Sequence, residues 1–454
     1  MKKYDVIIIG AGPAGIVTGV TAKNQFPDKS MLLIGEEEKG LVPCGIPYIF
    51  YDLNSVDKNA TGPKPFVDAG GVAIADAVVN VNIDNKKIKV KSGNEFSFDK
   101  LVFATGSDPV VASFIPGHDL KNVFYIKKSY NYITKLFNKL KNKKNIVVVG
   151  GGFIGAEVAE QLAKHSDKKV TIIESEEFCF SKAFSNELSK MGTEQLRKTN
   201  LNVYTSTFVD KVLGKDGVVI SVQFQDETIV EADAVIFAIG YKPNSELAEK
   251  AGLENNAMGA IIVDNYGRTS RDDIFAVGDC SQTIGYLTGR MDNIMLASTA
   301  TAEARLLGYS MFGVEIRNHF IGTIGIVSTV INGFTMASAG LNENDAATKN
   351  IDLISAEFSD FNRHPETIED ASPLTVKLYV SPFDGSILGG EVWGGKSAGE
   401  LINTIGLAIQ KELAVYDLIS LQIGTHPLLT TAPTKHLCIR AAEIAIAKIK
   451  GLIE

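Results

Sequence analysis

The chain has 454 residues, 45% of them hydrophobic, and this length exceeds what one hydrophobic core usually serves, so we expect two or three globular domains. A total of 45 Lys and Arg against 53 Asp and Glu leaves a net charge of -8 without a long basic run, so we expect no nucleic-acid partner. No stretch approaches the roughly 18 apolar residues of a membrane-spanning helix, so we expect no membrane partner and a cytoplasmic location.

The first predicted element is a βαβ unit. Residues 4–22, YDVIIIGAGPAGIVTGVTA, run from an apolar strand through a glycine loop into a helix, and the strand SMLLIGEEE follows. Glycine suits a tight turn and a backbone that approaches a pyrophosphate, and the helix N-terminus offers N–H groups to the anion. At the end of the second strand, Glu36 is predicted to accept hydrogen bonds from an adenosine ribose, with Glu37 as an alternative. The cofactor-binding residues predicted in the loop are Gly10, Gly12, Pro13 and Gly15.

Cysteine occurs four times, at positions too far apart for a disulfide framework or a zinc site, so no metal is predicted. Cys44 stands between a proline and a glycine in GLVPCGIPYI and is the candidate redox centre. The following segment, Leu53–Ile74, matches no motif and is considered as a cover over the substrate entrance. Buried structural roles are expected for the other three, Cys179, Cys280 and Cys438.

A second βαβ unit follows in residues 143–178, KKNIVVVGGGFIGAEVAEQLAKHSDKKVTIIESEEF. Glu174 ends its second strand and is followed by Ser175, Glu176 and Glu177, so a 2′-phosphate would meet carboxylates and NADH is favoured over NADPH. Two glycine loops in complete βαβ contexts predict two dinucleotides, and the alternative of two turns without a ligand is disfavoured. The predicted loop residues are Gly150, Gly152, Ile154 and Gly155.

Three further apolar strands end in glycine turns. FDKLVFATGSDP (98–109) and ADAVIFAIGYKPN (232–244) are expected to close the two sheets at their edges. TSRDDIFAVGDCSQ (269–282) places Asp279 at the carboxyl end of a buried strand, where open α/β sheets bind ligands, so Asp279 is predicted to hold a ribityl hydroxyl. The other cofactor-binding residues predicted in these turns are Thr105, Gly106, Gly240 and Gly278.

These motifs, in this order and over nearly the whole chain, resemble the FAD-dependent pyridine nucleotide:disulfide oxidoreductases. PCGIPY resembles the single-cysteine motif of the branch that holds coenzyme A-disulfide reductases, NADH oxidases and NADH peroxidases, and the chain has no CxxxxC pair. The resemblance implies an α/β fold with two Rossmann-like domains, one for FAD (1–115 and 245–320) and one for NADH (116–244). It also implies an α+β dimerisation domain (321–454) and a homodimer.

The same resemblance assigns roles to single residues. It implies that Asp279 binds the flavin ribitol and that Glu157 lies near the nicotinamide. Cys44 would open a helix beside the flavin, whose N-terminal dipole stabilises a thiolate. NADH would reduce FAD, the flavin would reduce a sulfur species on Cys44, and Cys44 would attack the next sulfur–sulfur or peroxide bond. The residues implied to line the flavin are Leu296, Ala297 and Thr299.

Two departures from the family bear on the substrate. Pro13 stands where the peroxidases and water-forming oxidases have a histidine for peroxide chemistry. Histidines stand near both tyrosine sites of the coenzyme A-disulfide reductases, His364 in NRHPE and His426 in GTHPLLTTAPT. An imidazole is a better acid at pH 7 than a tyrosine, so His426, then His364, is predicted to protonate the departing thiol. His426 resembles the family histidine that the partner subunit supplies, although threonines replace its acidic neighbour.

The sequence therefore predicts an enzyme that uses FAD and NADH to reduce a low-molecular-weight disulfide, persulfide or polysulfide through Cys44. A small-molecule sulfur substrate is thus the expected partner, besides a second copy of the chain. The first alternative is an NADH oxidase that reduces oxygen at the flavin. The second is a reductase of an electron-transfer protein such as rubredoxin, and the third, placed last, is a redox-sensing flavoprotein dimer.

Overall fold

The computed structural model describes residues 1–292, 294–313 and 319–453. The chain divides into two compact units, and the predicted division into three domains stays a prediction. No helix within the described ranges is long and apolar enough to cross a membrane. The first unit contains Met1–Ile146, Lys211–Val222 and Val230–Thr323, and the second contains Val147–Asp210, Gln223–Ile229 and Ile324–Glu454.

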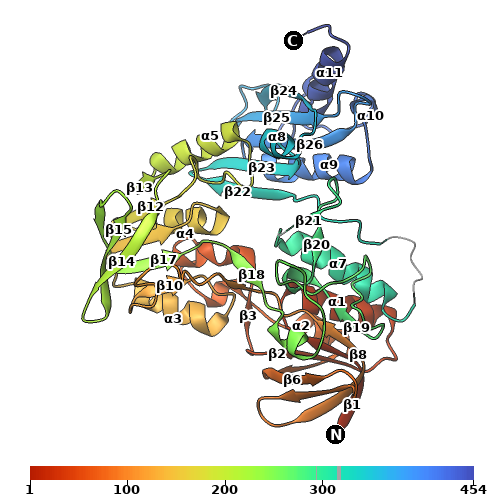
Figure 1. Ribbon diagram of the computed structural model, residues 1–454. Helices are drawn as coiled ribbons and strands as arrows, with labels where there is room; N and C mark the ends of the chain where they lie inside the picture. The colour runs from red at the N-terminus through yellow and green to blue at the C-terminus, as the bar shows by residue number, and fades with distance from the viewer. Residues whose placement is uncertain (293, 314–318, 454) are drawn as a thin grey trace. The chain divides into compact units, whose positions relative to one another are not determined.

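The first unit is built on a seven-stranded sheet (Figure 1). Its order is β5-β2-β1-β8-β7-β6, and β19 also pairs with β8. The strands β5, β2, β1, β8 and β19 run parallel, whereas β6, β7 and β8 form antiparallel pairs. Their bounds are β1 Lys2–Ile9, β2 Met31–Gly35, β5 Val72–Ala75, β6 Val78–Asn82, β7 Lys87–Val90, β8 Glu95–Phe103 and β19 Ile274–Ala276.

The expectation that the strand at 98–103 closes its sheet at an edge is wrong. It forms β8, which lies between β1 and β7 and also carries β19. The strand in 232–244, β17, likewise has a neighbour on each side. In a parallel sheet that is covered on both faces, edge strands and interior strands can both be apolar throughout. An apolar run that ends in a glycine turn therefore does not show whether its strand lies at an edge or in the interior of the sheet.

Alternate side chains of β1 enter two different cores, which explains the unbroken apolar run in this strand. Val6 and Ile8 pack into a core that includes residues of α1 (Pro13–Gln25) and α7 (Ala297–Ser310), and these two helices lie against each other (Figure 1). Ile7 packs on the opposite face with residues of β6, β7 and α6 (Glu246–Lys250). The parallel part of the sheet is therefore covered on both sides, as in a dinucleotide-binding domain.

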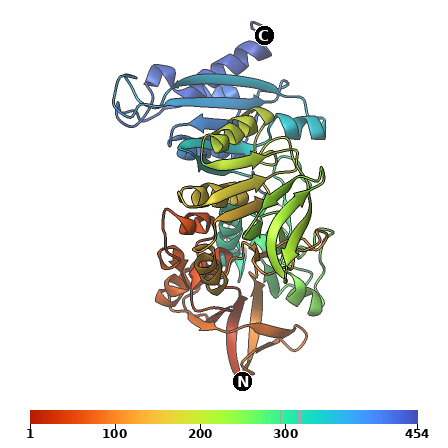
Figure 2. The same cartoon turned by 90° about the vertical axis from the view of Figure 1, so that its left-hand side faces the viewer.

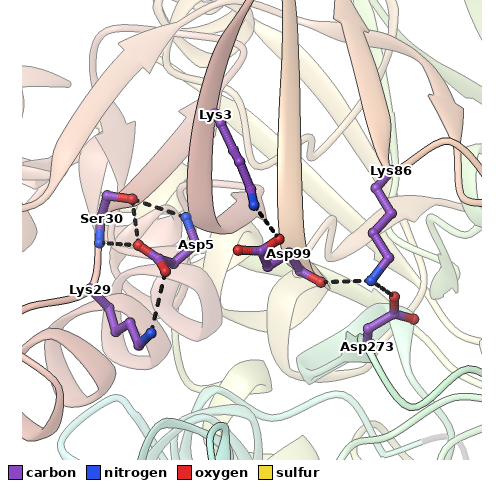
Figure 3. Close-up of polar contacts among 7 residues, drawn as sticks. All are labelled: Lys3, Asp5, Lys29, Ser30, Lys86, Asp99 and Asp273. Atoms are coloured by element: carbon purple, nitrogen blue, oxygen red, sulfur yellow. Dashed lines mark hydrogen bonds and ion pairs between the residues drawn. The ribbon is translucent and has the colours of Figure 1, made fainter.

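Charged side chains tie the strands together at the end of this sheet opposite the first glycine loop (Figure 3). Lys3 Nζ of β1 lies 2.8 Å from Asp99 Oδ1 of β8, and Lys86 Nζ lies 2.5 Å from Asp273 Oδ2 beside β19. Asp5 accepts hydrogen bonds from the backbone and side chain of the residue before β2. Exposed pairs of this kind contribute about 1 kcal/mol or less each, so the apolar cores dominate the stability.

The remaining elements of the first unit are short. The residues of β10 pair in parallel with those of β17, and β9 pairs with β18. The helices are α2 Lys64–Asp68, α3 Tyr130–Leu140, η1 Pro43–Gly45, η2 Pro47–Phe50, η3 Asp57–Asn59 and η4 Gly278–Cys280. The strands are β3 Gly40–Leu41, β4 Ala60–Thr61, β9 Ser107–Pro109, β10 Val123–Tyr125, β17 Ala234–Phe237, β18 Tyr241–Pro243, β20 Thr283–Ile284 and β21 Met291–Asp292. Strands that cross a boundary between the units are β11 Asn145–Val149, β14 Val209–Lys215, β15 Val218–Phe224 and β16 Ile229–Glu231.

The second unit combines the second glycine loop with a five-stranded antiparallel sheet of order β22-β23-β26-β25-β24. Helix α9 packs on β23 and β26, and the C-terminal helix α11 packs on β24 and β25 (Figures 1 and 2). This confirms the predicted α+β arrangement at the C-terminus. The bounds are α4 Phe153–Ala163, β12 Lys169–Ile173, α5 Asn186–Arg197, β13 Leu201–Tyr204, β22 Val327–Ile331, β23 Phe334–Gly340, α8 Glu343–Lys349, β24 Ile354–Phe361, β25 Pro373–Val380, β26 Ile387–Gly394, α9 Ala398–Gln410, α10 Val415–Leu418, η5 Pro433–Lys435 and α11 Leu437–Ile449.

Candidate active site

The first glycine loop joins β1 to α1 with no room for side chains at two of its glycines. Gly10 has a φ of +115°, and a Cβ at this position would lie 2.1 Å from the carbonyl oxygen of Ala104. A Cβ on Gly15 would lie 1.9 Å from Gly10 O. Gly12 is the N-cap of α1 and has open space around it, and Pro13 begins the helix. The helix N-terminus is therefore open to an anion, which fits the pyrophosphate of FAD.

A cavity of about 250 Å³ lies beside this loop and is the candidate site for the adenosine of FAD. Glu37 was the alternative to Glu36 as the ribose acceptor, but its carboxylate accepts hydrogen bonds from Ser129 Oγ and Tyr130 N, both at 2.7 Å. Glu37 thus caps α3, whereas Glu36 is exposed. The cavity is lined by Ala11, Leu33, Gly35, Glu37, Glu38, Pro63, Ala73, Ile74 and Ala75.

The segment Leu53–Ile74, which matched no motif, contributes to this nucleotide cavity. It forms η3, β4, α2 and most of β5, and β5 extends the seven-stranded sheet beside β2. Pro63, Ala73 and Ile74 line the cavity, and the sequence reasoning missed them. The β-branched residues Val72 and Ile74 were the sequence signal that could have identified β5.

Asp279 lies at the carboxyl end of β19, where the sequence placed it. Its side chain is 13% exposed, and its Oδ2 accepts hydrogen bonds from Lys128 Nζ at 2.6 Å and Ser107 Oγ at 2.7 Å. Thr105 donates to Asn244 O and so ties the turn after β8 to the region of β18. Three segments distant in the sequence therefore meet around Asp279. Gly106 and Gly278 have positive φ in the turns beside it, as Gly240 has in the turn after β17.

The N-terminus of α7 holds the other residues predicted to contact the flavin. Leu296 is its N-cap, Ala297 its first residue, and Thr299 Oγ1 lies 2.8 Å from Thr323 Oγ1. One turn further, Glu303 accepts a hydrogen bond of 2.9 Å from the backbone N–H of Gly278. Burial raises the pKa of Glu303 to about 8, the hydrogen bond from Gly278 opposes this, and nearby Asp279 adds to it. The sequence reasoning missed Glu303, which looks like an ordinary helix residue in sequence.

The second glycine loop repeats the geometry of the first. Gly150 has a φ of +110°, and Gly152 is the N-cap of α4. Glu174 Oε2 accepts a hydrogen bond of 2.5 Å from Gly151 N, while its Oε1 accepts one of 2.8 Å from Glu176 N. The carboxylate is thereby directed at the loop, where a dinucleotide ribose would lie. Ile154 is half-buried and Gly155 buried in the first turn of α4.

Glu157 lies on α4 and is half-buried against the C-terminal sheet. Thr329 of β22 donates a hydrogen bond of 2.7 Å to Glu157 Oε1. Burial raises the pKa of Glu157 to about 7, the hydrogen bond from Thr329 lowers it, and the neighbouring Glu160 raises it further. The carboxyl group can therefore gain or lose a proton near neutral pH.

Cys44 lies exposed in the middle of η1. The expectation that it opens a helix needs correction: η1 and η2 are two short 3₁₀ turns, because the prolines at their first positions and Gly45 do not favour a continuous α-helix. The strand β3 that leads to Cys44 approaches the first glycine loop, since a Cβ on Gly40 would lie 4.0 Å from Ala11 O.

The other three cysteines are buried, and none of the four is in a disulfide. Burial raises the pKa of the Cys179 and Cys438 thiols to about 12 and also raises that of Cys280. A thiol of this kind is a poor nucleophile at neutral pH. Of the four cysteines, Cys44 alone is exposed.

The two predicted histidines lie on neighbouring loops of the second unit. His364 N donates to Pro427 O at 3.2 Å, and His364 Nδ1 lies 2.9 Å from Thr430 O. His426 is exposed, and its Nδ1 accepts a hydrogen bond of 3.2 Å from Leu428 N. With Nδ1 as an acceptor, the proton of the neutral imidazole is on Nε2, where it can form a hydrogen bond to an acceptor.

Comparison with known proteins agrees with these two nucleotide loops. Residues 4–304 match the family described as pyridine nucleotide-disulphide oxidoreductase, and residues 326–437 match its dimerisation domain. An NAD(P)H coenzyme A polysulfide/persulfide reductase of Pyrococcus horikoshii is 30% identical over 87% of this chain and 88% of its own length. An NADH oxidase of Methanocaldococcus jannaschii is 28% identical over 93% of this chain and 94% of its own.

A solved structure gives the same result for the fold. The NAD-dependent persulfide reductase from A. fulgidus superposes with a TM-score of 0.90 at 29% identity, covering 99% of this chain and 84% of the other. The chain is an FAD- and NAD(P)H-dependent oxidoreductase of the group that includes NADH oxidases and coenzyme A-dependent persulfide reductases. With two glycine loops, a predicted flavin aspartate and a C-terminal antiparallel sheet in place, the chain belongs to the pyridine nucleotide-disulphide oxidoreductase family.

Proposed function

We propose that the protein is an NADH-dependent reductase of a low-molecular-weight disulfide, persulfide or polysulfide, with Cys44 as its redox-active residue. The observation that carries this proposal is the exposed thiol of Cys44, four residues after Gly40, which approaches the first glycine loop. Similarity to two proteins named as persulfide reductases supports the sulfur substrate. Bound FAD would accept a hydride from NADH and supply two electrons to sulfur.

The chemistry assigned to Cys44 is a thiol–disulfide exchange. The Cys44 thiolate attacks one sulfur of a substrate RS–SR, so that a Cys44–S–SR bond forms and RS⁻ leaves. Two electrons that originate from NADH then cleave the new bond into the Cys44 thiolate and a second RS⁻. The overall change is NADH + H⁺ + RS–SR → NAD⁺ + 2 RSH.

The departing RS⁻ requires a proton donor, and His426 is proposed for this role. Its imidazole lies on an exposed loop within the matched dimerisation domain, and in its imidazolium form it would give up a proton to the departing RS⁻. We propose a homodimer in which this loop reaches the Cys44 of the other chain. Exposed apolar side chains in the same domain, among them Phe383 at 84% and Leu429 at 71%, support such an interface. His364, which holds the same loop, is the second choice.

NADH is proposed over NADPH because the ribose end of the second loop is acidic. Glu174 is directed toward the loop by Gly151 N, and Glu176 and Glu177 follow it. A ribose 2′-OH can donate to a carboxylate, whereas a 2′-phosphate would be repelled.

The first test is an anaerobic NADH titration of the purified enzyme and of Cys44→Ser, followed by flavin absorbance. Both proteins are first treated with a small disulfide and freed of the excess, so that Cys44 of the wild type carries a mixed disulfide. We expect the wild type to consume more than one NADH per flavin before the flavin is fully reduced, because the Cys44–S–SR bond accepts a second electron pair. The variant should consume one and should lose disulfide reduction. Ferricyanide reduction is the control, since it requires the two cofactor sites but not Cys44. Identical titrations of the two proteins would contradict the proposal.

NADH oxidase activity is the second candidate, because a relative of this name matches 93% of the chain. Oxygen reduction at the flavin needs no cysteine nucleophile to form hydrogen peroxide. If this is the main activity, Cys44→Ser will consume oxygen at the wild-type rate with NADH, and disulfides or polysulfides will not accelerate NADH oxidation in either protein.

A further inference from the structure

The side chain of Asn59 is buried next to the turn that contains Cys44. Asn59 ends η3, in the segment Leu53–Ile74 that no motif explained, and is 5% exposed. Its neighbours Asp57 and Lys58 in the same turn are exposed. A buried amide needs hydrogen-bond partners, so the contacts of Asn59 indicate what it supports.

On the N-terminal side of Cys44, Asn59 binds the backbone of Val42 twice. Asn59 Nδ2 donates to Val42 O at 3.0 Å, and Val42 N donates to Asn59 O at 3.1 Å. Val42 O also accepts the hydrogen bond of 3.0 Å from Gly45 N that closes the η1 turn. One carbonyl group therefore holds both the turn around Cys44 and the Asn59 side chain.

On the C-terminal side of Cys44, Asn59 lies directly against Gly45. A Cβ placed on Gly45 would lie 2.0 Å from Asn59 Oδ1, so a side chain there would displace the amide. Asn59 thus contacts the residues on both sides of Cys44 and leaves the thiol itself exposed.

The η3 turn is itself held in place by two other elements. Asp57 Oδ1 accepts hydrogen bonds from Tyr130 OH of α3 at 2.6 Å and from Lys39 Nζ at 2.7 Å. The N-terminus of α3 is in turn capped by Glu37. Through Tyr130 of α3 and through Glu37, the η3 turn that contains Asn59 is linked to the end of β2, which borders the nucleotide cavity.

From these contacts we propose that Asn59 is a positioning residue for Cys44: its amide holds Val42 O and Gly45 so that the thiol has one orientation toward substrate. The proposal rests on the proposed redox role of Cys44. The N–H groups of Asn59 Nδ2 are required for this role, because an aspartate of the same shape has no N–H for Val42 O and brings a repelling negative charge next to it.

The variants that test this are Asn59→Ala and Asn59→Asp, with Lys58→Ala as the matched control on the same turn. The holoenzyme, reduced anaerobically, is alkylated with iodoacetamide across pH 6 to 10, and modification of the Cys44 peptide is followed by mass spectrometry. Turnover with a small disulfide and with ferricyanide is measured on the same preparations.

We expect both Asn59 variants to alter the rate of Cys44 alkylation, or to move the midpoint of its pH profile, by a change equivalent to about fivefold or more. The kcat for the disulfide should fall by a similar factor, while the ferricyanide rate and the Lys58→Ala control stay at wild-type values. If Asn59→Ala fails to retain FAD, the isosteric Asn59→Asp carries the test.

The proposal is overturned if both Asn59 variants alkylate and turn over like the wild type. Failure of the proposed function looks different: Asn59 variants would alter alkylation, yet Cys44→Ser would keep disulfide turnover. The reverse result, an inactive Cys44→Ser with unaltered alkylation in the Asn59 variants, would reject only the role of Asn59.

Discussion

Two carboxyl groups with raised pKa values, the half-buried Glu157 and the buried Glu303, lie among the residues of the candidate site. Burial raises the pKa of Glu157 to about 7 and that of Glu303 to about 8. Both carboxyls accept a hydrogen bond, from Thr329 Oγ1 and from Gly278 N, and in both cases this bond only partly offsets burial. A native state that keeps a proton which the unfolded chain has lost becomes less stable as the pH rises.

We predict that Glu303→Gln removes the part of this pH dependence of stability that comes from Glu303. In the wild type, the free energy of unfolding should fall as the pH rises from about 4.5, where the unfolded carboxyl titrates, to about 8, where the buried one does. Gln keeps an acceptor for Gly278 N but has no proton to lose. Urea unfolding with saturating FAD should therefore show nearly equal stability at pH 4.5 and a variant that is more stable at pH 8.5, by up to roughly 5 kcal/mol. Parallel pH profiles would contradict the raised pKa.

At the scale of elements, the two consecutive carboxylates that follow β2 have different surroundings. Glu37 binds the N-terminus of α3, where its charge also interacts favourably with the helix dipole. Glu36 is exposed and is not among the residues that line the nucleotide cavity. It stays the proposed acceptor for the adenosine ribose because Glu37 is engaged by α3. A pair of single substitutions can separate these tasks.

We predict that Glu37→Ala lowers the free energy of unfolding by about 1 to 2 kcal/mol, because two N-terminal backbone groups of α3 and Ser129 Oγ lose an acceptor. Glu36→Ala should leave the stability of the FAD-free protein unchanged and weaken FAD binding about fivefold or more. Thermal unfolding and fluorescence titration with FAD measure the two effects. If instead Glu37→Ala weakens FAD binding and Glu36→Ala lowers the free energy of unfolding, Glu37 is the ribose ligand.

At the scale of the whole molecule, the proposed homodimer predicts complementation between two defective chains. In a hybrid of Cys44→Ser and His426→Ala chains, one site would pair an intact Cys44 with an intact His426 of the partner subunit. The other site would have neither group. We therefore expect hybrid dimers, purified through two different tags, to recover up to half of the wild-type disulfide turnover.

The control for this experiment is each parent homodimer, in which every site lacks one group. If the hybrid is no more active than the parents, then His426 acts within its own chain or is not the proton donor. Ferricyanide turnover of all three dimers should stay at the wild-type level, because it depends on the cofactor sites alone.

Local sequence determined the parts of this protein that depend on backbone geometry near a single residue. Gly10 and Gly150 occupy positive φ, and at Gly10 a Cβ would also collide with a neighbouring carbonyl, so the glycine loops were readable without a structure. Asp279 could be placed because the carboxyl end of a parallel strand is where such sheets bind ligands. The two nucleotide folds and the C-terminal α+β domain were predicted on this basis and on the family resemblance.

Contacts between distant segments decided which residues meet in the candidate site and where each strand lies in its sheet. Glu36 and Glu37 are indistinguishable in sequence, and only the packing of α3 against the end of β2 showed which one is engaged. The interior position of β8 and the role of Leu53–Ile74 in the nucleotide cavity likewise depend on partners far along the chain. Sequence alone thus determined which chemical groups are present and the local turns that hold them. Only the tertiary structure decided which groups meet, because hydrogen bonds and burial join residues that sequence spacing does not relate.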